Sequence, residues 1–127
     1  MEIAGKIIAV ASGGALGAVA RYLINLSPLS TILEGFPLPT FVINVVGSFL
    51  IGLVVTAAEG RVEVGESTSL AIVVGFIGAF TTFSTFEMEI YGLLHARQLS
   101  LAAAYIFLSL VVGFLGLLGG VALGRRL

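Results

Sequence analysis

The stretch GAFTTFSTFEME, residues 78–89, places hydroxyl side chains among phenylalanines inside an otherwise apolar run. The hydroxyls are those of Thr81, Thr82, Ser84 and Thr85, and the rings are those of Phe80, Phe83 and Phe86. Glycines precede the cluster and glutamates follow it, which is typical of a discontinuous membrane helix. Backbone groups that such a break releases need protein or a water-filled cavity around them. The stretch therefore predicts a helix that breaks within residues 78–82.

The composition around this stretch places the chain in the membrane class. Of its 127 residues, 58% are hydrophobic and 10% are charged. Four apolar spans, residues 3–26, 38–58, 69–94 and 99–123, are each long enough to cross about 30 Å of hydrocarbon as a helix. Because the first span continues past Arg21, we expect a retained helix and not a cleaved signal peptide. We expect an all-α, multi-pass membrane protein, with residues 1–127 forming one four-helix transmembrane domain.

Several functional classes are disfavoured by what the chain lacks. There is no cysteine, and the one histidine, His95, cannot form a histidine-based zinc site by itself. The net charge is −1 without a basic cluster, so we expect no nucleic-acid partner. The connections are too short for a soluble catalytic domain, and no nucleophile, base and orienting group can be assembled. We therefore expect a protein that is not an enzyme.

The charges give only a weak orientation signal. Four spans place both termini and the connection near residue 60 on one side, with the cations Lys6, Arg61, Arg125 and Arg126. The other side carries Arg97, with Arg21 near a helix end. This bias favours one orientation only slightly. Both a single orientation and insertion in two orientations with antiparallel pairing are compatible with it.

Glycines recur at four-residue spacing on the first and fourth spans. They are Gly13 and Gly17 on the first, and Gly116, Gly120 and Gly124 on the fourth. Small residues at this spacing let membrane helices approach closely. We expect them to form a compact bundle that pairs with a partner subunit.

Polar side chains follow one stripe of the second span. Thr40, Asn44 and Ser48 are four residues apart and so share one face of a helix. Asn44 lies well inside the span, where an unpaired amide is costly. It is either an interhelical hydrogen-bonding group or a pore or ligand group with two donors to offer.

The aromatic residues of the third span suggest an anion path, although plain packing explains them as well. Phe80, Phe83 and Phe86 are three apart, and we expect them to share a helical face. Ring edges carry positive potential and can contact a small anion if hydroxyl and amide donors supplement them. Carbonyls released by the break would suit a hard cation such as Na+, and released N–H groups would suit an anion.

Charged and polar groups continue this pattern. Arg21 either extends its charged end to the membrane surface or stabilises an anion and fixes a vestibule. We expect Glu87 and Glu89 to lie near an aqueous mouth. Tyr105 and Ser109, four residues apart, could extend a polar track along the fourth span.

The chain resembles the Fluc/CrcB fluoride channels. The resemblance rests on GGALGAVARY, TFVINVVGSFLIG and GFIGAFTTFSTFEME, in this order and along essentially the whole chain. It implies small four-helix chains that assemble as antiparallel, dual-topology homodimers with two pores. It further implies passive export of fluoride across the cell inner membrane, which lowers cytoplasmic fluoride, and a structural Na+ at the dimer interface.

The same resemblance implies roles for individual residues. Phe83 and Phe86 match the pore phenylalanines whose ring edges contact fluoride, and Asn44 matches the pore-lining amide. The Na+ would be bound by the backbone carbonyls of Gly78 and Thr81 from both subunits. The other matches are Ser84, Thr85 and Ser109 for the polar track, Arg21 for a first-helix arginine and Glu89 for a vestibule glutamate.

One position departs from the family pattern, and three other functions compete with the channel interpretation. Gly113 stands where some relatives carry a track serine, so the outer end of the track is open. A small multidrug-type cation/proton antiporter needs an acid in the first span, which has none beyond Glu2. A proton-coupled fluoride carrier would have to use Glu87 or Glu89, and a non-transporting scaffold would use the same residues for packing alone. The chain has no nucleotide-binding motif, which disfavours a pumping cycle. We therefore expect fluoride to cross the lipid bilayer through the protein by electrodiffusion.

Overall fold

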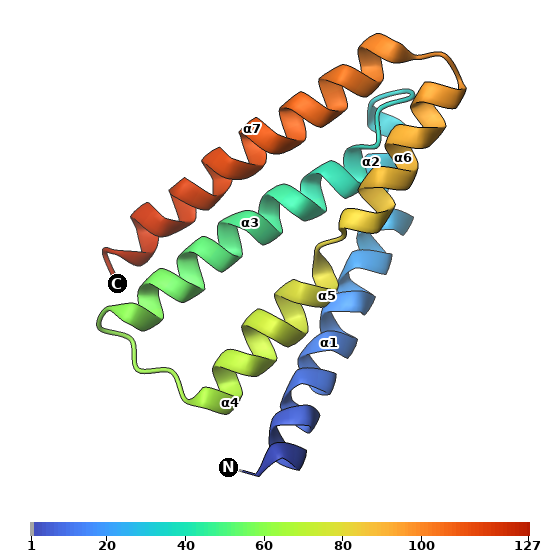
Figure 1. Ribbon diagram of the computed structural model, residues 1–127. Coiled ribbons are helices and arrows are strands. Elements are labelled where there is room, and N and C mark those ends of the chain that lie inside the picture. Colours follow the sequence, from blue (N-terminus) through green and yellow to red (C-terminus); the bar gives the residue numbers. More distant parts are fainter. Residues whose placement is uncertain (1) are drawn as a thin grey trace.

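The computed structural model describes residues 2–127, and all regular structure in this range is helical (Figure 1). The elements in chain order are α1 (Ile3–Leu26), α2 (Leu29–Ile32), α3 (Leu38–Glu59), α4 (Glu66–Ser69), η1 (Leu70–Ile77), α5 (Gly78–Phe80), α6 (Phe83–His95) and α7 (Leu99–Gly124). They form four segments long and apolar enough to cross a membrane: Ile3–Ile32, Leu38–Glu59, Glu66–His95 and Leu99–Gly124. The expectation of an all-α membrane protein with four spans is confirmed.

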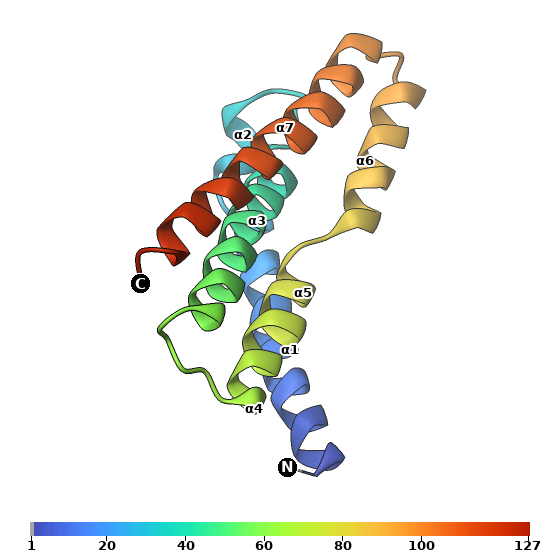
Figure 2. The same ribbon diagram turned by 60° about the vertical axis from the view of Figure 1, so that its left-hand side comes forward.

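The four segments alternate in direction, so both termini lie at one end of the molecule. The connection between α3 and α4 lies at that same end, while α2 and the turn between α6 and α7 lie at the other (Figure 1). Helices α3 and α7 run side by side in the same direction, and α1 runs beside the first half of the third segment (Figures 1 and 2).

Glycines make both of these helix pairs close. A methyl group at Gly52 would overlap the Leu117 carbonyl, and one at Gly120 would overlap the Phe49 carbonyl. On the other pair, Gly13 and Gly17 lie against the backbone of η1 in the same manner. The spaced glycines therefore pack helices within the chain, as small residues do in membrane bundles.

The third segment is a composite. Its first half, α4, η1 and α5, packs against α1, whereas α6 packs against α7 (Figure 2). The aromatic rings of Phe86 and Tyr105 belong to the small core between α6 and α7, together with Leu93 and Ala102. The segment thus changes partner where it breaks, and a break there was the expectation from residues 78–82.

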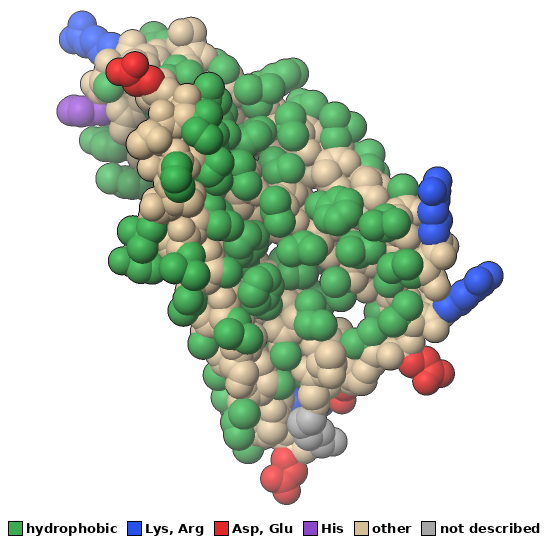
Figure 3. Space-filling model, turned by 180° about the vertical axis from the view of Figure 1, so that it is seen from behind, with side chains coloured by type: hydrophobic (Ala, Val, Ile, Leu, Met, Phe, Trp, Pro, Cys, Tyr) green, Lys and Arg blue, Asp and Glu red, His purple; other side chains and the backbone are tan. Residues whose placement is uncertain are grey.

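The surface is largely apolar, and the charges lie at its ends. Hydrophobic side chains cover most of the face seen in Figure 3, with basic and acidic groups near its extremities. At one end, Lys6 Nζ and Glu66 Oε1 form an ion pair of 2.6 Å that joins α1 to α4. A surface of this kind is suited to lipid or to another membrane chain.

Candidate functional site

The break in the third segment lies between Phe80 and Phe83. Thr81 and Thr82 have extended backbones, with φ/ψ of −77°/155° and −149°/112°. Thr82 is the N-cap of α6: its Oγ1 accepts a hydrogen bond from the Thr85 N–H at 3.3 Å and donates one to the Thr85 hydroxyl at 3.1 Å. A capping side chain supplies a partner that the missing helical turn would have supplied. The extended backbones of Thr81 and Thr82 and the capping bond from Thr82 to Thr85 therefore define the break.

Asn44 on α3 holds the break from one side. Its Nδ2 donates to the Thr82 carbonyl at 3.1 Å, and its Oδ1 accepts from the Thr82 N–H at 2.9 Å. One side-chain amide therefore pairs both backbone groups of one residue, much as a neighbouring strand would. An unpaired backbone group at this depth would cost free energy, so the pair stabilises the non-helical conformation.

Gly47 on α3 makes this approach possible. A methyl group at this position would overlap the Cγ2 atom of Thr81. Gly47 follows Asn44 by three residues and so lies on the same face of α3. Sequence reasoning missed its role, although this spacing was the signal for it.

Arg21 on α1 contacts the break from another side. Its Nε donates to the Ala79 carbonyl at 3.1 Å, and the side chain is part-buried. The expected position near the end of the first span is confirmed, but the carbonyl partner was not foreseen. Hydrogen bonding to a released carbonyl is one way in which a membrane protein accommodates an internal arginine.

An open cavity of about 260 Å³ lies against the break. Its lining comes from α3, the end of η1 and the break itself, and includes Asn44, Ser48, Thr81, Thr82 and Phe83. Two residues of the expected polar stripe, Asn44 and Ser48, therefore face a common space with the hydroxyl cluster. The cavity combines apolar walls with a few polar groups, as small-ligand sites do.

The three phenylalanines do not share one helical face, which corrects that expectation. Phe80 precedes the break and stacks on Phe76, with ring centroids 5.6 Å apart. Phe83 and Phe86 follow the break on α6, with centroids 6.1 Å apart. The extended backbone between the two helices cancels the three-residue periodicity, so Phe80 is separated from the other two rings.

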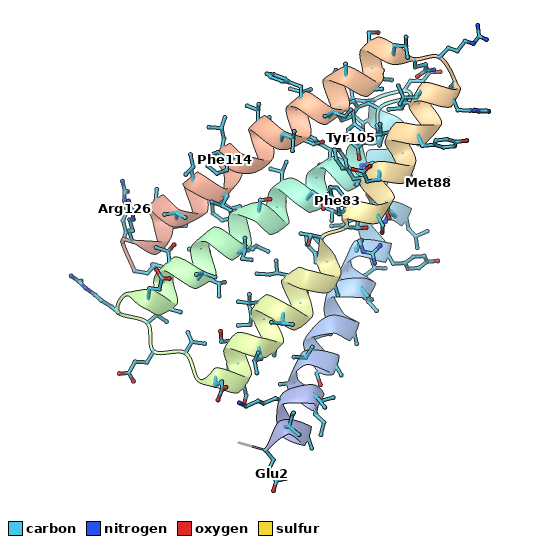
Figure 4. The ribbon with its side chains drawn as sticks, in the orientation of Figure 1. Glu2, Phe83, Met88, Tyr105, Phe114 and Arg126 are labelled. Carbon is cyan, nitrogen blue, oxygen red and sulfur yellow. The ribbon has the colours of Figure 1, made fainter. Side chains whose placement is uncertain are left out.

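Phe83 and Phe86 differ in environment. Phe83 is 73% exposed and lies at the start of α6 (Figure 4). Phe86 is buried, and its ring meets that of Tyr105 in a T-shaped contact with centroids 5.0 Å apart. One ring therefore borders the open cavity, and the other lies between α6 and α7.

Glu89 belongs to a polar cluster next to these rings. The Tyr105 hydroxyl donates to Glu89 Oε1 at 3.2 Å, and Tyr105 reaches from α7 towards α6 (Figure 4). Thr40 on α3 is buried next to both groups. This neighbour was missed from the sequence, because nothing in the spacing links residues so far apart along the chain.

The remaining expected track residues lie on both sides of this cluster. Ser84 is exposed and Thr85 half-buried near the start of α6. Ser109 Oγ on α7 is buried and has no hydrogen-bond partner among the described residues. Gly113 is buried near Ser48 Oγ, which would lie 3.9 Å from an added Cβ. The polar track through Ser84, Thr85 and Ser109 stays a prediction.

Comparison with known proteins adds to this geometry. The family model for the CrcB-like protein, Camphor Resistance (CrcB), matches residues 8–121. A fluoride-specific ion channel FluC of Agrobacterium fabrum is 42% identical over 122 residues, which cover 96% of this chain and 98% of the relative. The protein of the same name in Acidobacterium capsulatum is 43% identical with the same coverage. A third, from Chlorobium chlorochromatii, is 40% identical over 127 residues, which cover 98% of this chain and 96% of the relative.

Proposed function

The chain belongs to the CrcB-like family, and on that premise we propose that it is a fluoride-selective ion channel of the bacterial inner membrane. Fluoride leaves the cytoplasm passively through it, which lowers cytoplasmic fluoride. The observation that carries the proposal is the capped break in the third segment, which lies against an open cavity between Asn44 and Phe83.

The start of α6 supplies donors for an anion. A helix N-terminus presents N–H groups that have no helical acceptor and carries a partial positive charge. Phe83 and Ser84 are the first two residues of α6. Their position at the break supports a fluoride path that starts from the cavity.

We assign the fluoride path to Asn44, Phe83 and Phe86, with Ser84, Thr85 and Ser109 as its polar track. Ring edges carry positive potential towards an anion. Asn44 uses one N–H for Thr82, and a primary amide has a second N–H to offer. The buried Ser109 hydroxyl, unpartnered among the described residues, supports a track that a small anion can use. Selectivity over chloride would follow from fixed dipoles in a narrow path.

A structural Na+ fits the backbone of the break. The hydrogen bonds that stabilise it use the carbonyls of Ile77, Ala79 and Thr82, and those of Gly78 and Thr81 accept none of these bonds. Among the described residues there is no group of three acidic, histidine or cysteine side chains suited to a metal. Backbone carbonyls at membrane depth are therefore the appropriate ligands for a hard cation.

Two carbonyls make only part of a cation's shell, which supports assembly with a second copy of the chain. In an antiparallel homodimer, Gly78 and Thr81 of both copies would meet around one Na+. The large exposure of Phe83 beside the break fits such an interface. Insertion in both orientations agrees with the weak bias of Lys and Arg between the two ends.

Passive conduction agrees with the chemistry of the spans better than exchange does. Helix α1 contains no carboxylate, and an antiporter that exchanges protons for cations would need one there. Hydrogen fluoride crosses lipid from an acidic exterior and dissociates in the cytoplasm. An inside-negative potential then drives the fluoride ion out through the channel.

Efflux from liposomes tests the proposal. Protein would be reconstituted in vesicles loaded with potassium fluoride or potassium chloride, and valinomycin would set the potential. We expect rapid fluoride release, read with an ion-selective electrode, and no comparable chloride release. Equal release of both ions, or no release from folded dimeric protein, would contradict the channel and favour the antiporter or the scaffold.

A further inference from the structure

Arg21 is a charged residue on a membrane helix, and among the described residues the identified contact of its side chain is with a backbone carbonyl. The ion pair formed within the described residues joins Lys6 to Glu66, and none involves Arg21. Its Nε lies 3.1 Å from the Ala79 oxygen. The guanidinium therefore acts on the backbone of the third segment.

Ala79 lies two residues before the extended backbone of the break. Carbonyls in the last turn of a helix have no helical donor and need a partner from elsewhere. Arg21 supplies that partner from α1, while Asn44 pairs Thr82 from α3. The break is held on its two sides by two different helices.

We infer that Arg21 is a positioning residue that fixes the break through its Nε–H donor, and that its positive charge is not what the channel requires. The inference deepens the proposed function, because the same break borders the proposed fluoride path and carries the Gly78 and Thr81 carbonyls. Loss of the bond would release the end of α5 and alter the geometry of both.

Covalent structure separates the donor from the charge. The Nε of arginine and the Nε2 of glutamine are both the fourth atom beyond Cα, so Arg21→Gln retains an N–H at the same place without the charge. Arg21→Lys retains the charge but moves the nitrogen one bond further out. Arg21→Met removes both properties. The effects of the three variants therefore differ according to whether Arg21 acts as a hydrogen-bond donor, as a charge or through packing alone.

Amide hydrogen exchange in detergent micelles tests the geometry of the break independently of fluoride transport. We expect Arg21→Met and Arg21→Lys to raise exchange in peptides that cover residues 78–85 by about tenfold or more, which corresponds to a lost hydrogen bond. Arg21→Gln should stay close to the wild-type protein. Lys6→Gln is the matched control, because it removes a cation on the same helix whose partner is on α4.

Fluoride efflux should follow the same order. We expect the Met and Lys variants to lose about tenfold in rate, and the Gln variant to remain near wild type. Efflux restored by Arg21→Lys but not by Arg21→Gln would overturn the inference and show a role for the charge in attracting the anion. Wild-type behaviour in all three variants would overturn it in favour of packing. Failure of the wild-type protein to release fluoride would contradict the proposed function, while the exchange pattern would still decide the role of Arg21.

Discussion

At the scale of single residues, the site depends on side chains that replace missing secondary structure. Asn44 supplies to Thr82 the donor and acceptor that a helix would have supplied, and Thr82 supplies an acceptor to Thr85. Gly47 provides the space in which Thr81 approaches α3. Each of these contributions is specific to one atom pair and can be tested by a conservative change.

Gly47→Ala should destabilise the protein by about 1–3 kcal/mol, because the new methyl group overlaps Thr81 Cγ2. The measurement is unfolding in mixed detergent micelles. Adding Thr81→Ser removes Cγ2 and keeps the hydroxyl, so the double variant should recover most of the loss. Gly92→Ala is the control, since nothing lies within 4 Å of an added Cβ there. Equal effects at Gly47 and Gly92 would contradict the steric explanation.

Asn44→Asp should reduce both stability and fluoride efflux. A carboxylate still accepts from the Thr82 N–H but cannot donate to the Thr82 carbonyl, which it repels. Loss of a hydrogen bond in a buried setting costs about 1–3 kcal/mol, and we expect at least about tenfold slower efflux. Asn25→Asp is the matched control, since Asn25 donates to the Arg21 carbonyl from an exposed position. Wild-type efflux from Asn44→Asp would show that the pair of hydrogen bonds between Asn44 and Thr82 is dispensable.

At the scale of elements, the π-helical conformation of η1 matches the spacing of its contacts to the spacing of the glycines on α1. The carbonyls of Ala71 and Phe76, five residues apart, lie where methyl groups at Gly13 and Gly17, four residues apart, would be. Backbone hydrogen bonds span five residues in a π-helix and four in an α-helix. Five-residue spacing on η1 therefore meets four-residue spacing on α1 along one line of contact.

Deletion of Val74 should be tolerated for this reason. Its side chain is exposed, and the deletion brings Ala71 and Phe76 to four-residue spacing, so that an α-helix can keep both contacts. We expect the variant to fold and to release fluoride within about threefold of wild type, since no hydrogen-bonded pair is lost.

A one-residue deletion in regular helix is the control for this prediction. Removing Leu50 from α3 turns the rest of that helix by about 100° and takes Gly52 away from α7. We expect this variant to fail to fold as a dimer in size-exclusion chromatography. Similar damage from both deletions would show that η1 has no spare residue.

At the scale of the whole molecule, the chain presents apolar surface almost everywhere and charge only at its ends (Figure 3). Neither the packing of α1 on η1 nor that of α3 on α7 covers Phe83 or the cavity beside it. The proposed antiparallel homodimer would cover both. Its formation requires that the chain insert in both orientations.

Charge reversals should separate the two orientations. Glu63→Lys adds a cation near the termini, and Glu34→Lys adds one at the opposite end; each is expected to enforce one orientation. Either variant alone should give little fluoride efflux, and co-expression of both should restore it. Because the chain has no cysteine, a cysteine added after Leu127 reports orientation through impermeant thiol labelling. Full efflux from one variant that labels from a single side would exclude the antiparallel assembly.

The sequence by itself determined the four spans and the place of the break. Hydrophobic runs of this length have no other stable state in a bilayer than helices. Thr82 at the break also caps α6 through its bond with Thr85, and this effect is local because the two residues are close in sequence. Four-residue spacing along a helix is also a local property, so the polar stripe of α3 and the position of Asn44 within it could be predicted.

Only the tertiary structure decided which groups meet at the break. The Ala79 partner of Arg21, the approach of Gly47 to Thr81 and the contact of Thr40 with Glu89 all join distant parts of the chain. The common face expected for Phe80 and Phe83 was wrong because two extended residues turn α6 away from α5. Helical periodicity extends only through continuous hydrogen bonds, and where they stop, the neighbouring helices determine the direction of the chain.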